Sequence, residues 1–408
     1  MDVKNTFLNG NLIEEVYMQS HPGSSVPSTK VCNLRRALYG LKQAPRTWFV
    51  KFNSTISDFG FSTSAYDSAL FICKTERGVI IILLLYVDDV IITGDDTVGI
   101  SSLKQFLDRQ FEMKDLGLLS YFLYLEIVHD PSSYFVTQAK YTSDLLAHAG
   151  LTNCKTAPTP VDPQTRLTSL DGHLLSDATL YHQLVGNLVY LIVTRLDIAY
   201  VVHIVSQFMA APHFPHYDAL VRILCYLKGT MFHGLHYSTH SSLQLHAFSD
   251  EDWARDPTNR LSTIRFCFFL GDSLLAWRSK KQTLVAYSST EAQYRALSDI
   301  TQELVWLRWL LSNMWVFHST VINLYCDNLS AIQIAHNDVF HDRTKHIEID
   351  CHFIRQHVTS GIVRLIFVIS VDQIAGIFTK AHPPNRFSDL VSKLKLVDTS
   401  HLESEGGY

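Results

Sequence analysis

The chain has 408 residues, 47% hydrophobic and 18% charged, which excludes a disordered protein and allows about two or three domains. Its formal net charge of -5 argues against broad nucleic-acid binding, although basic residues can still be concentrated locally. Its seven cysteines are scattered without a CxxC pair, as is typical of free thiols in a reducing compartment. The most apolar run, residues 79–87, is too short to span a bilayer, so we expect no membrane segment.

The first 155 residues mix short apolar runs with turn signals, which predicts an α/β or α+β domain. Residues 155–176 are rich in Thr, Pro, Ser and Asp and predict a linker. Apolar residues then recur at helical spacing up to about residue 240. They include a predicted helix at 216–228 that Gly229 ends.

From residue 243 the pattern changes to alternation, which predicts a layered domain. We expect strands at 243–249, 263–270, 274–278, 321–326 and 363–369, a long amphipathic helix with its apolar stripe from Ala292 to Leu311, and helices at 329–336 and 347–359. This order resembles that of ribonuclease H-like domains, which have a mixed five-stranded sheet with helices.

Two adjacent carboxylates, Asp88 and Asp89, follow a strongly strand-forming apolar run. Successive strand residues point to opposite faces, so a tight hairpin is needed to present both side chains usefully. Burying like charges is costly, and a divalent cation is the natural compensation. A metal pair needs another carboxylate, for which Asp2 is the candidate. Alone, an Asp-Asp pair after a strand is more often an ordinary turn.

Three segments resemble the polymerase motifs of copia-type reverse transcriptases: residues 1–10, residues 38–48 (LYGLKQAPRTW) and Tyr86–Asp89 (YVDD). The resemblance implies that Asp2, Asp88 and Asp89 bind two Mg²⁺ (or Mn²⁺) ions for nucleotidyl transfer. It also implies that the ring of Phe7 selects against a 2′-hydroxyl on the incoming sugar. The implied substrate-binding residues are Phe7, Gly40, Lys42, Gln43, Pro45 and Tyr86.

A second set of acids is spread over three predicted elements. Asp250 ends the first strand of the layered domain, Glu291 lies in the first turn of the long helix, and Asp327 ends the buried strand. Carboxylates at strand ends and at a helix start can converge on one metal pair. Each alone has a plainer reading, since an acid in a first turn is favoured by the helix dipole. Ser289 or Thr290 is the predicted helix cap.

With residues 277–282 (WRSKKQ) and 344–346 (TKH), these acids resemble the ribonuclease H of copia-type elements. The resemblance implies metal-assisted hydrolysis of an RNA strand by Asp250, Glu291 and Asp327. That family has a fourth acid at the position of Gly376 here, and Asp372, one helical turn earlier, is the candidate substitute. Further departures from the family pattern are Tyr124, where Gly is usual, Leu196, where Pro is usual, and Leu261, Arg265 and Phe266.

These departures predict impaired activity, and the alternative of a catalytically inactive nucleic-acid-binding retroelement remnant stays open. A zinc site of His341, His346, Cys351 and His352 is disfavoured, because their spacing does not match a structural zinc pattern.

The resemblance also implies the organisation and the partners. The expected domains are a reverse transcriptase palm and primer-grip region without fingers (1–155, an antiparallel sheet with helices), a linker and helical thumb or connection region (156–242), a ribonuclease H-like domain (243–392) and a tail (393–408). The expected partners are an RNA template, a DNA primer, an RNA–DNA hybrid and dNTPs, in an intracellular, cytoplasmic particle. The sequence does not indicate an oligomeric state.

Overall fold

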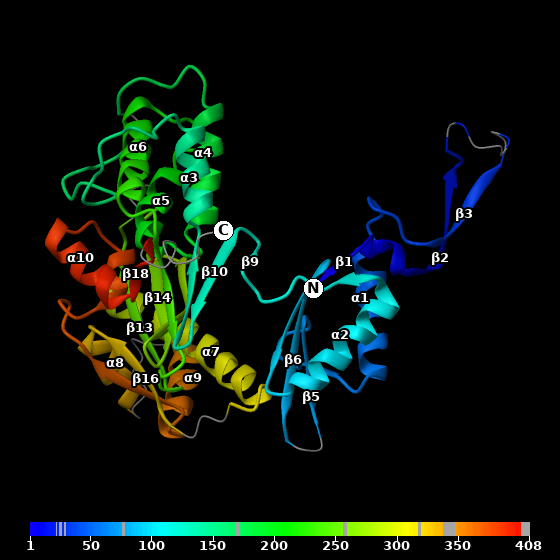
Figure 1. Cartoon of the computed structure of the whole chain (residues 1–408). Helices are drawn as coiled ribbons and strands as arrows, with labels where there is room; N and C mark the ends of the chain where they lie inside the picture. Colours follow the sequence, from blue (N-terminus) through cyan, green and yellow to red (C-terminus); the bar gives the residue numbers. More distant parts are fainter. Residues whose placement is uncertain are drawn as a thin grey trace. The chain divides into compact units, whose positions relative to one another are not determined.

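The computed structural model describes residues 1–21, 23, 27, 30–75, 78–168, 171–255, 259–316, 320–337 and 347–400. His341 and the 344–346 motif therefore lie outside the described residues. The chain divides into two compact units, Met1–Leu119 with Arg308–Phe317 and Ser120–Leu307 with His318–Tyr408, called here the first and second unit. Both combine helices with sheets, which confirms the predicted multidomain α/β and α+β class (Figure 1).

The first unit is built on a six-stranded antiparallel sheet in the order β4-β5-β6-β7-β1-β8. Strand β6 buries alternate side chains, which pack with apolar residues of α1 and α2 into one core. Its helices and strands are β1 (Asp2–Val3), η1 (Thr6–Asn9), β2 (Asn11–Gln19), β3 (Val31–Arg36), α1 (Ala44–Asp58), β4 (Ser62–Thr63), β5 (Leu70–Lys74), β6 (Ile80–Tyr86), β7 (Asp89–Gly94), α2 (Thr97–Phe111) and β8 (Met113–Lys114).

The predicted tight hairpin joins β6 to β7. Tyr86 pairs with Asp89, so Val87 and Asp88 form a two-residue turn, and Val87 adopts a left-handed φ of 55°. The buried indole of Trp48 in α1 donates a hydrogen bond to the Val87 carbonyl at 2.7 Å. This bond ties the turn to the helix, although a β-branched residue is poorly suited to positive φ.

The second unit contains a five-stranded antiparallel sheet in the order β18-β12-β11-β10-β9. It draws strands from both sides of the predicted domain boundaries at 155, 242 and 392, which remain predictions. The predicted helix at 216–228 is confirmed as α6. The elements are β9 (Tyr121–Phe122), β10 (Leu125–Asp130), β11 (Ser133–Thr137), α3 (Ala139–His148), α4 (Thr179–Leu191), η2 (Leu196–Ile198), α5 (Ala199–Ser206), α6 (Phe214–Gly229), β12 (His233–Ser238) and β18 (Leu396–Asp398).

The β9–β10 turn contains Tyr124, at a position where copia-type reverse transcriptases, which this segment resembles, usually have glycine. Leu123 and Tyr124 both have positive φ, 47° and 59°, as a two-residue hairpin turn of this kind requires. The Tyr124 ring packs against Tyr141 and Tyr190, and the Tyr190 hydroxyl donates a hydrogen bond to the Leu123 carbonyl. Aromatic packing thus offsets part of the backbone strain of this turn.

The other sheet of the second unit has the order β15-β14-β13-β16-β17. The first three strands are antiparallel, whereas β16 and β17 run parallel to β13, so the predicted mixed five-stranded sheet is confirmed. The remaining elements are β13 (Leu245–Asp252), β14 (Thr263–Leu270), β15 (Ser273–Lys281), α7 (Ser289–Asn313), β16 (Ile322–Cys326), α8 (Leu329–His336), α9 (Glu348–Thr359), β17 (Val363–Phe367), η4 (Ile374–Phe378) and α10 (Pro384–Lys393). The end of α7, from Arg308, belongs to the first unit. None of the helices in the described ranges is long and apolar enough to cross a bilayer.

We expect Trp48→Phe to lower the free energy of unfolding by about 1–3 kcal/mol, because the Val87 carbonyl loses its donor and the core loses volume. Chemical denaturation followed by circular dichroism measures this change. Trp253→Phe is the matched control, since its indole donates a similar bond to the Ala286 carbonyl from a ring that is 48% exposed. Equal losses in the two variants would contradict the anchoring role of Trp48.

Candidate functional site

The first candidate centre consists of Asp2, Asp88 and Asp89, which the fold brings together although Asp2 lies far from the other two along the chain. Asp2 in β1 is the register partner of Asp89 in β7, so their side chains lie on the same face of the sheet. Asp88 occupies the preceding turn, and its carbonyl accepts a hydrogen bond from the backbone of Val3 at 2.9 Å. The three carboxylates therefore belong to one corner of the sheet.

Electrostatic repulsion is evident at this corner. Burial raises the pKa of Asp89 above its usual range, and the charges of Asp88 and Asp2 raise it further. Asp88 is exposed and Asp89 half-buried, so solvent can reach the centre. A cation placed here would relieve the repulsion.

The second polymerase-like segment lies against the other two. The Phe7 ring packs on Tyr39 at a centroid distance of 4.8 Å, and the Gly10 carbonyl accepts a hydrogen bond from Ala37. Gly40 has a left-handed φ of 92°, which favours glycine there. The remaining predicted substrate-binding residues are Lys42 and Gln43, just before α1, Pro45 in its first turn, and Tyr86, half exposed at the end of β6.

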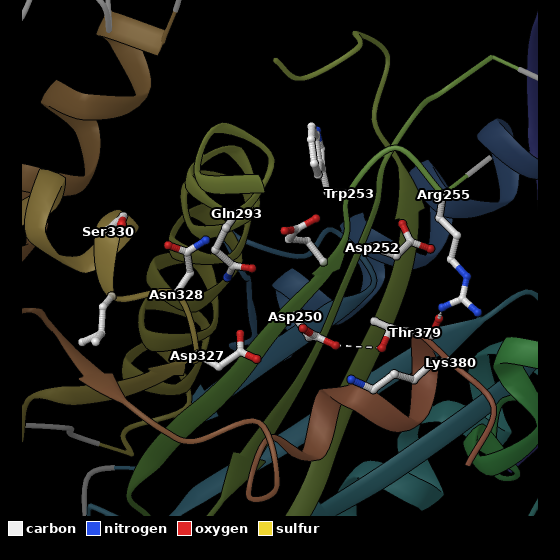
Figure 2. A pocket seen from close by; sticks show the side chains of 12 residues that line it. Asp250, Asp252, Trp253, Arg255, Gln293, Asp327, Asn328, Ser330, Thr379 and Lys380 are labelled. Atoms are coloured by element: carbon white, nitrogen blue, oxygen red, sulfur yellow. Dashed lines mark hydrogen bonds between the residues drawn. The ribbon is translucent and has the colours of Figure 1, made fainter. Parts of the chain in front are cut away.

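The second candidate centre is a pocket of about 570 Å³ at the ends of β13 and β16 (Figure 2). Ser249 and Cys326 are register partners in these parallel strands, so Asp250 and Asp327, which follow them, emerge together and line the pocket. Thr379 donates a hydrogen bond to Asp250 Oδ2 at 2.7 Å, and Ser370 donates one to Asp327 Oδ2 at 2.9 Å. The parallel pairing of β13 and β16 thus brings these two acids together, as was expected from the sequence.

Glu291 is turned toward its own helix. One carboxylate oxygen accepts a hydrogen bond from the backbone of Tyr287, and the other pairs with Arg295 at 2.7 Å. Glu291 is not among the described residues that line the pocket, which instead receives Gln293 from α7. Its role as a metal ligand therefore stays a prediction. The hydroxyl of Ser288 accepts the hydrogen bond from the Glu291 backbone, in place of the predicted caps Ser289 and Thr290.

Gly376 lies beside Asp250. It occupies the position at which the copia-type ribonuclease H, which this segment resembles, has its fourth acid. A Cβ atom built on Gly376 would be 3.9 Å from Asp250 Oδ2 and 4.0 Å from Lys380 Cε, so a side chain fits there. Asp372, the proposed substitute, pairs with Lys393 at 2.8 Å and is not one of the described residues that line the pocket. The position next to Asp250 thus lacks a carboxylate from this segment.

Glu251 is the pocket residue that the sequence reasoning missed. Burial first, and then the charges of Asp250, Asp252 and Asp327, raise its pKa to about 8. Burial and Asp327 raise the pKa of Asp250 to about 6, although Lys380 opposes this shift. Among the described residues, nothing donates a hydrogen bond to the buried Oε2 atom of Glu251. Three consecutive acids, Asp250–Asp252, were the available signal.

Both centres offer the hard oxygen ligands that Mg²⁺ and Mn²⁺ prefer. As the side chains lie, no three His, Cys, Asp or Glu groups within the described ranges are close enough to form a finished metal site. The orphaned Oε2 of Glu251 and the raised pKa values of Asp250 and Glu251 nevertheless fit a cation, because burial and the neighbouring acids disfavour the ionised carboxylates and a cation would favour them.

The cation-free chain should lose stability as the pH rises. Folded Glu251 keeps its proton up to about pH 8, whereas the unfolded carboxyl ionises near 4.5, so the free energy of unfolding falls between these values. We expect Glu251→Gln to stabilise the chain in EDTA at pH 8 by about 1–3 kcal/mol, after discounting for partial exposure. Thermal melting measures this, with Asp272→Asn, whose side chain is 80% exposed, as the control. An unchanged or lower melting temperature for Glu251→Gln would refute the expectation.

Comparison with known proteins identifies the family. A family described as reverse transcriptase (RNA-dependent DNA polymerase) matches residues 1–163. The chain is 41% identical over 396 residues to the retrovirus-related Pol polyprotein from transposon RE1 of Arabidopsis thaliana, covering 97% of this chain and 27% of that protein. It is 35% identical over 398 residues to the Pol polyprotein from transposon TNT 1-94 of Nicotiana tabacum, covering 95% and 30%. It is also 31% identical over 310 residues to a transposon Ty5-1 protein of Saccharomyces cerevisiae, covering 74% and 100%.

Similar solved structures are more distant. A foamy viral protease–reverse transcriptase in complex with double-stranded DNA matches with a TM-score of 0.43 and 10% identity, over 90% of this chain and 59% of that chain. An N-terminal ribonuclease H domain from Mycobacterium tuberculosis matches with a TM-score of 0.26 and 11% identity, over 37% and 98%. The chain spans 27% and 30% of the RE1 and TNT 1-94 Pol polyproteins that it matches. On the sequence relatives, it belongs to the family of copia-type retrotransposon Pol polyproteins, and its residues 1–163 match the reverse transcriptase family.

Proposed function

We propose that the chain is an RNA-directed DNA polymerase at the first centre and cleaves the RNA strand of RNA–DNA hybrids at the second. The observation that supports this most is the pairing of Asp2 with Asp89 across β1 and β7, with Asp88 in the adjoining turn. Acids distant in sequence are gathered at one corner, where burial and the charges of Asp88 and Asp2 raise the pKa of Asp89, as expected of a metal-dependent nucleotidyl transferase without its cation. The proposed partners are an RNA template, a DNA primer, a hybrid duplex and dNTPs.

At the first centre, Asp2, Asp88 and Asp89 would hold Mg²⁺ or Mn²⁺. The bound cations would supply Lewis-acid activation of the primer 3′-hydroxyl and stabilisation of the leaving pyrophosphate. The chain itself orients the substrate. Phe7, held by Tyr39, would lie under the incoming sugar and exclude a 2′-hydroxyl, while the segment from Gly40 to Pro45 would line the template and nucleotide.

At the second centre, Asp250 and Asp327 would hold the cation, with Glu291 as the third ligand implied by the family motif. For Glu291 this requires its carboxylate to leave Arg295. Thr379 would keep the Asp250 carboxylate oriented through its hydrogen bond to Oδ2. The cation would supply activation of a water molecule that attacks the RNA phosphodiester.

A second candidate function is nucleic-acid binding without catalysis. It is favoured by the absence of an acid at Gly376 and by the engagement of Glu291 with Arg295, both of which weaken the second centre. Binding of this kind would be strongly salt-dependent, because phosphate contacts release counterions. The two activity tests below separate this candidate from the enzyme, since a binder retains hybrid affinity without turnover.

We expect Asp88→Asn to reduce primer extension on an RNA template by at least about 100-fold, because it removes a charged metal ligand worth several kcal/mol. Incorporation of labelled dNTPs with Mg²⁺ measures the rate. Asp95→Asn is the matched control, since Asp95 is an exposed acid just beyond the opposite end of β7. The polymerase proposal fails if the wild-type chain does not extend the primer, or if Asp88→Asn extends it normally.

Hybrid cleavage tests the second centre separately. We expect Asp250→Asn to lower cleavage of a labelled RNA–DNA hybrid at least about 100-fold while leaving primer extension within about twofold of wild type, because Asp250 lies in the other unit. Asp272→Asn, on the exposed turn between β14 and β15, should cleave normally. Hybrid binding without cleavage by the wild-type chain would support the binding candidate instead.

A further inference from the structure

Two of the free cysteines lie side by side in the second unit, although they are far apart along the chain. Cys154 follows α3, immediately before the predicted linker, and Cys225 is on α6. Their side chains are hydrogen-bonded to one another. Both residues are half-buried, so small solutes reach the thiols from solution. Neither belongs to a candidate centre, so the pair has no part in the proposed chemistry.

Backbone contacts keep the two cysteines together. The N–H group of Ala157 donates a hydrogen bond to the Cys225 carbonyl at 3.2 Å. The Lys228 ammonium donates one to the Cys154 carbonyl at 2.7 Å. The segment 154–157 therefore lies along the last turns of α6, and the two thiols remain neighbours when their side chains change rotamer. Neighbouring backbones of this kind are what a disulfide requires, because its two Cα atoms must lie close together.

The Cys225 thiol is poorly suited to react first with an oxidant. Burial, and then the neighbouring Cys154 thiol, raise the pKa of Cys225 to about 11, although Lys228 and Arg222 oppose this shift. Because the thiolate is the reactive form, Cys225 stays protonated and unreactive near neutral pH. The first attack is therefore expected at Cys154, with Cys225 in place to react with the product.

We propose that a peroxide oxidises Cys154 and Cys225 to a reversible disulfide, which fixes the start of the linker on α6. The Cys154 sulfur attacks one peroxide oxygen, so that an S–O bond forms, the O–O bond breaks and water leaves. The Cys225 sulfur then attacks the resulting sulfenic acid, so that the S–S bond forms and the S–O bond breaks. Two thiols and one hydrogen peroxide thus give one disulfide and two waters. In a reducing compartment such bonds are transient and redox-sensing.

The test is mass spectrometry of the full chain, treated with hydrogen peroxide, denatured without reductant and digested with trypsin. We expect the peptide that contains Cys154 to be joined to the peptide that contains Cys225, at a mass lower than their sum by two hydrogen atoms, and dithiothreitol should separate them. Cys225→Ser should leave Cys154 as a sulfenic acid that dimedone labels. Cys73→Ser is the matched control, since Cys73 is also a half-buried free thiol but lies in β5 of the first unit, and it should leave the cross-link unchanged.

Trypsin cleavage of the folded chain measures the effect of the bond. Lys155 is exposed within the segment that the disulfide would fix. We expect cleavage after Lys155 to be at least about tenfold slower in the oxidised chain, because a protease needs the segment to unfold locally. Near-ultraviolet circular dichroism verifies that each reduced variant is folded.

The proposal is overturned if Cys154 and Cys225 still take up iodoacetamide after peroxide treatment, if either pairs with a different cysteine instead, or if Lys155 is cut at equal rates in the reduced and oxidised chains. None of these measurements depends on primer extension or hybrid cleavage. The disulfide proposal and the proposed function therefore fail separately.

Discussion

The crowding of like-charged carboxylates at strand ends is the constraint on which the rest of this structure depends. Each centre gathers acids that the chain keeps far apart, and in each the pKa of at least one carboxylate is raised by burial and by its neighbours. Strand pairing overcomes the repulsion, through the Asp2–Asp89 register in the first unit and the parallel β13–β16 pair in the second. The cores of the two units stabilise these registers, because a slip of one residue would turn every buried side chain outward.

Much of the fold could be predicted from sequence, because hydrophobic periodicity is a local property. The strand at 263–270 and the helix at 329–336 have the predicted bounds, and the Asp88 hairpin follows from two acids after an apolar strand. The sequence did not predict that the strands of the antiparallel sheet in the second unit form a single sheet. Its strands come from three separate stretches of chain, and pairing between distant segments leaves no local pattern.

The site residues were predictable where a motif fixes the position of the backbone. They were less predictable where the direction of the side chain determines whether a residue reaches the site. Asp250 and Asp327 lie together because each directly follows one member of the register pair Ser249–Cys326 in two parallel strands. The direction of Glu291 depends on Arg295, one turn along its own helix. The pocket that Glu251 lines is shared with Thr379 and Lys380, which lie far along the chain. Departures from the family pattern are also accommodated locally: Leu196 is fully buried in the second unit's core, and Arg265 pairs with Asp252.

The strand order of the second unit bears on how the protein is made. Strand β12 lies between β11 and β18, so the sheet is complete only when residues Leu396–Asp398 have been added. During synthesis on the ribosome, β12 therefore waits with one unpaired edge while some 160 further residues are translated. Exposed edges of this kind invite pairing with other chains. Strand β18 thus acts as a late covering strand, and a nascent chain that stops short of it would be prone to aggregate.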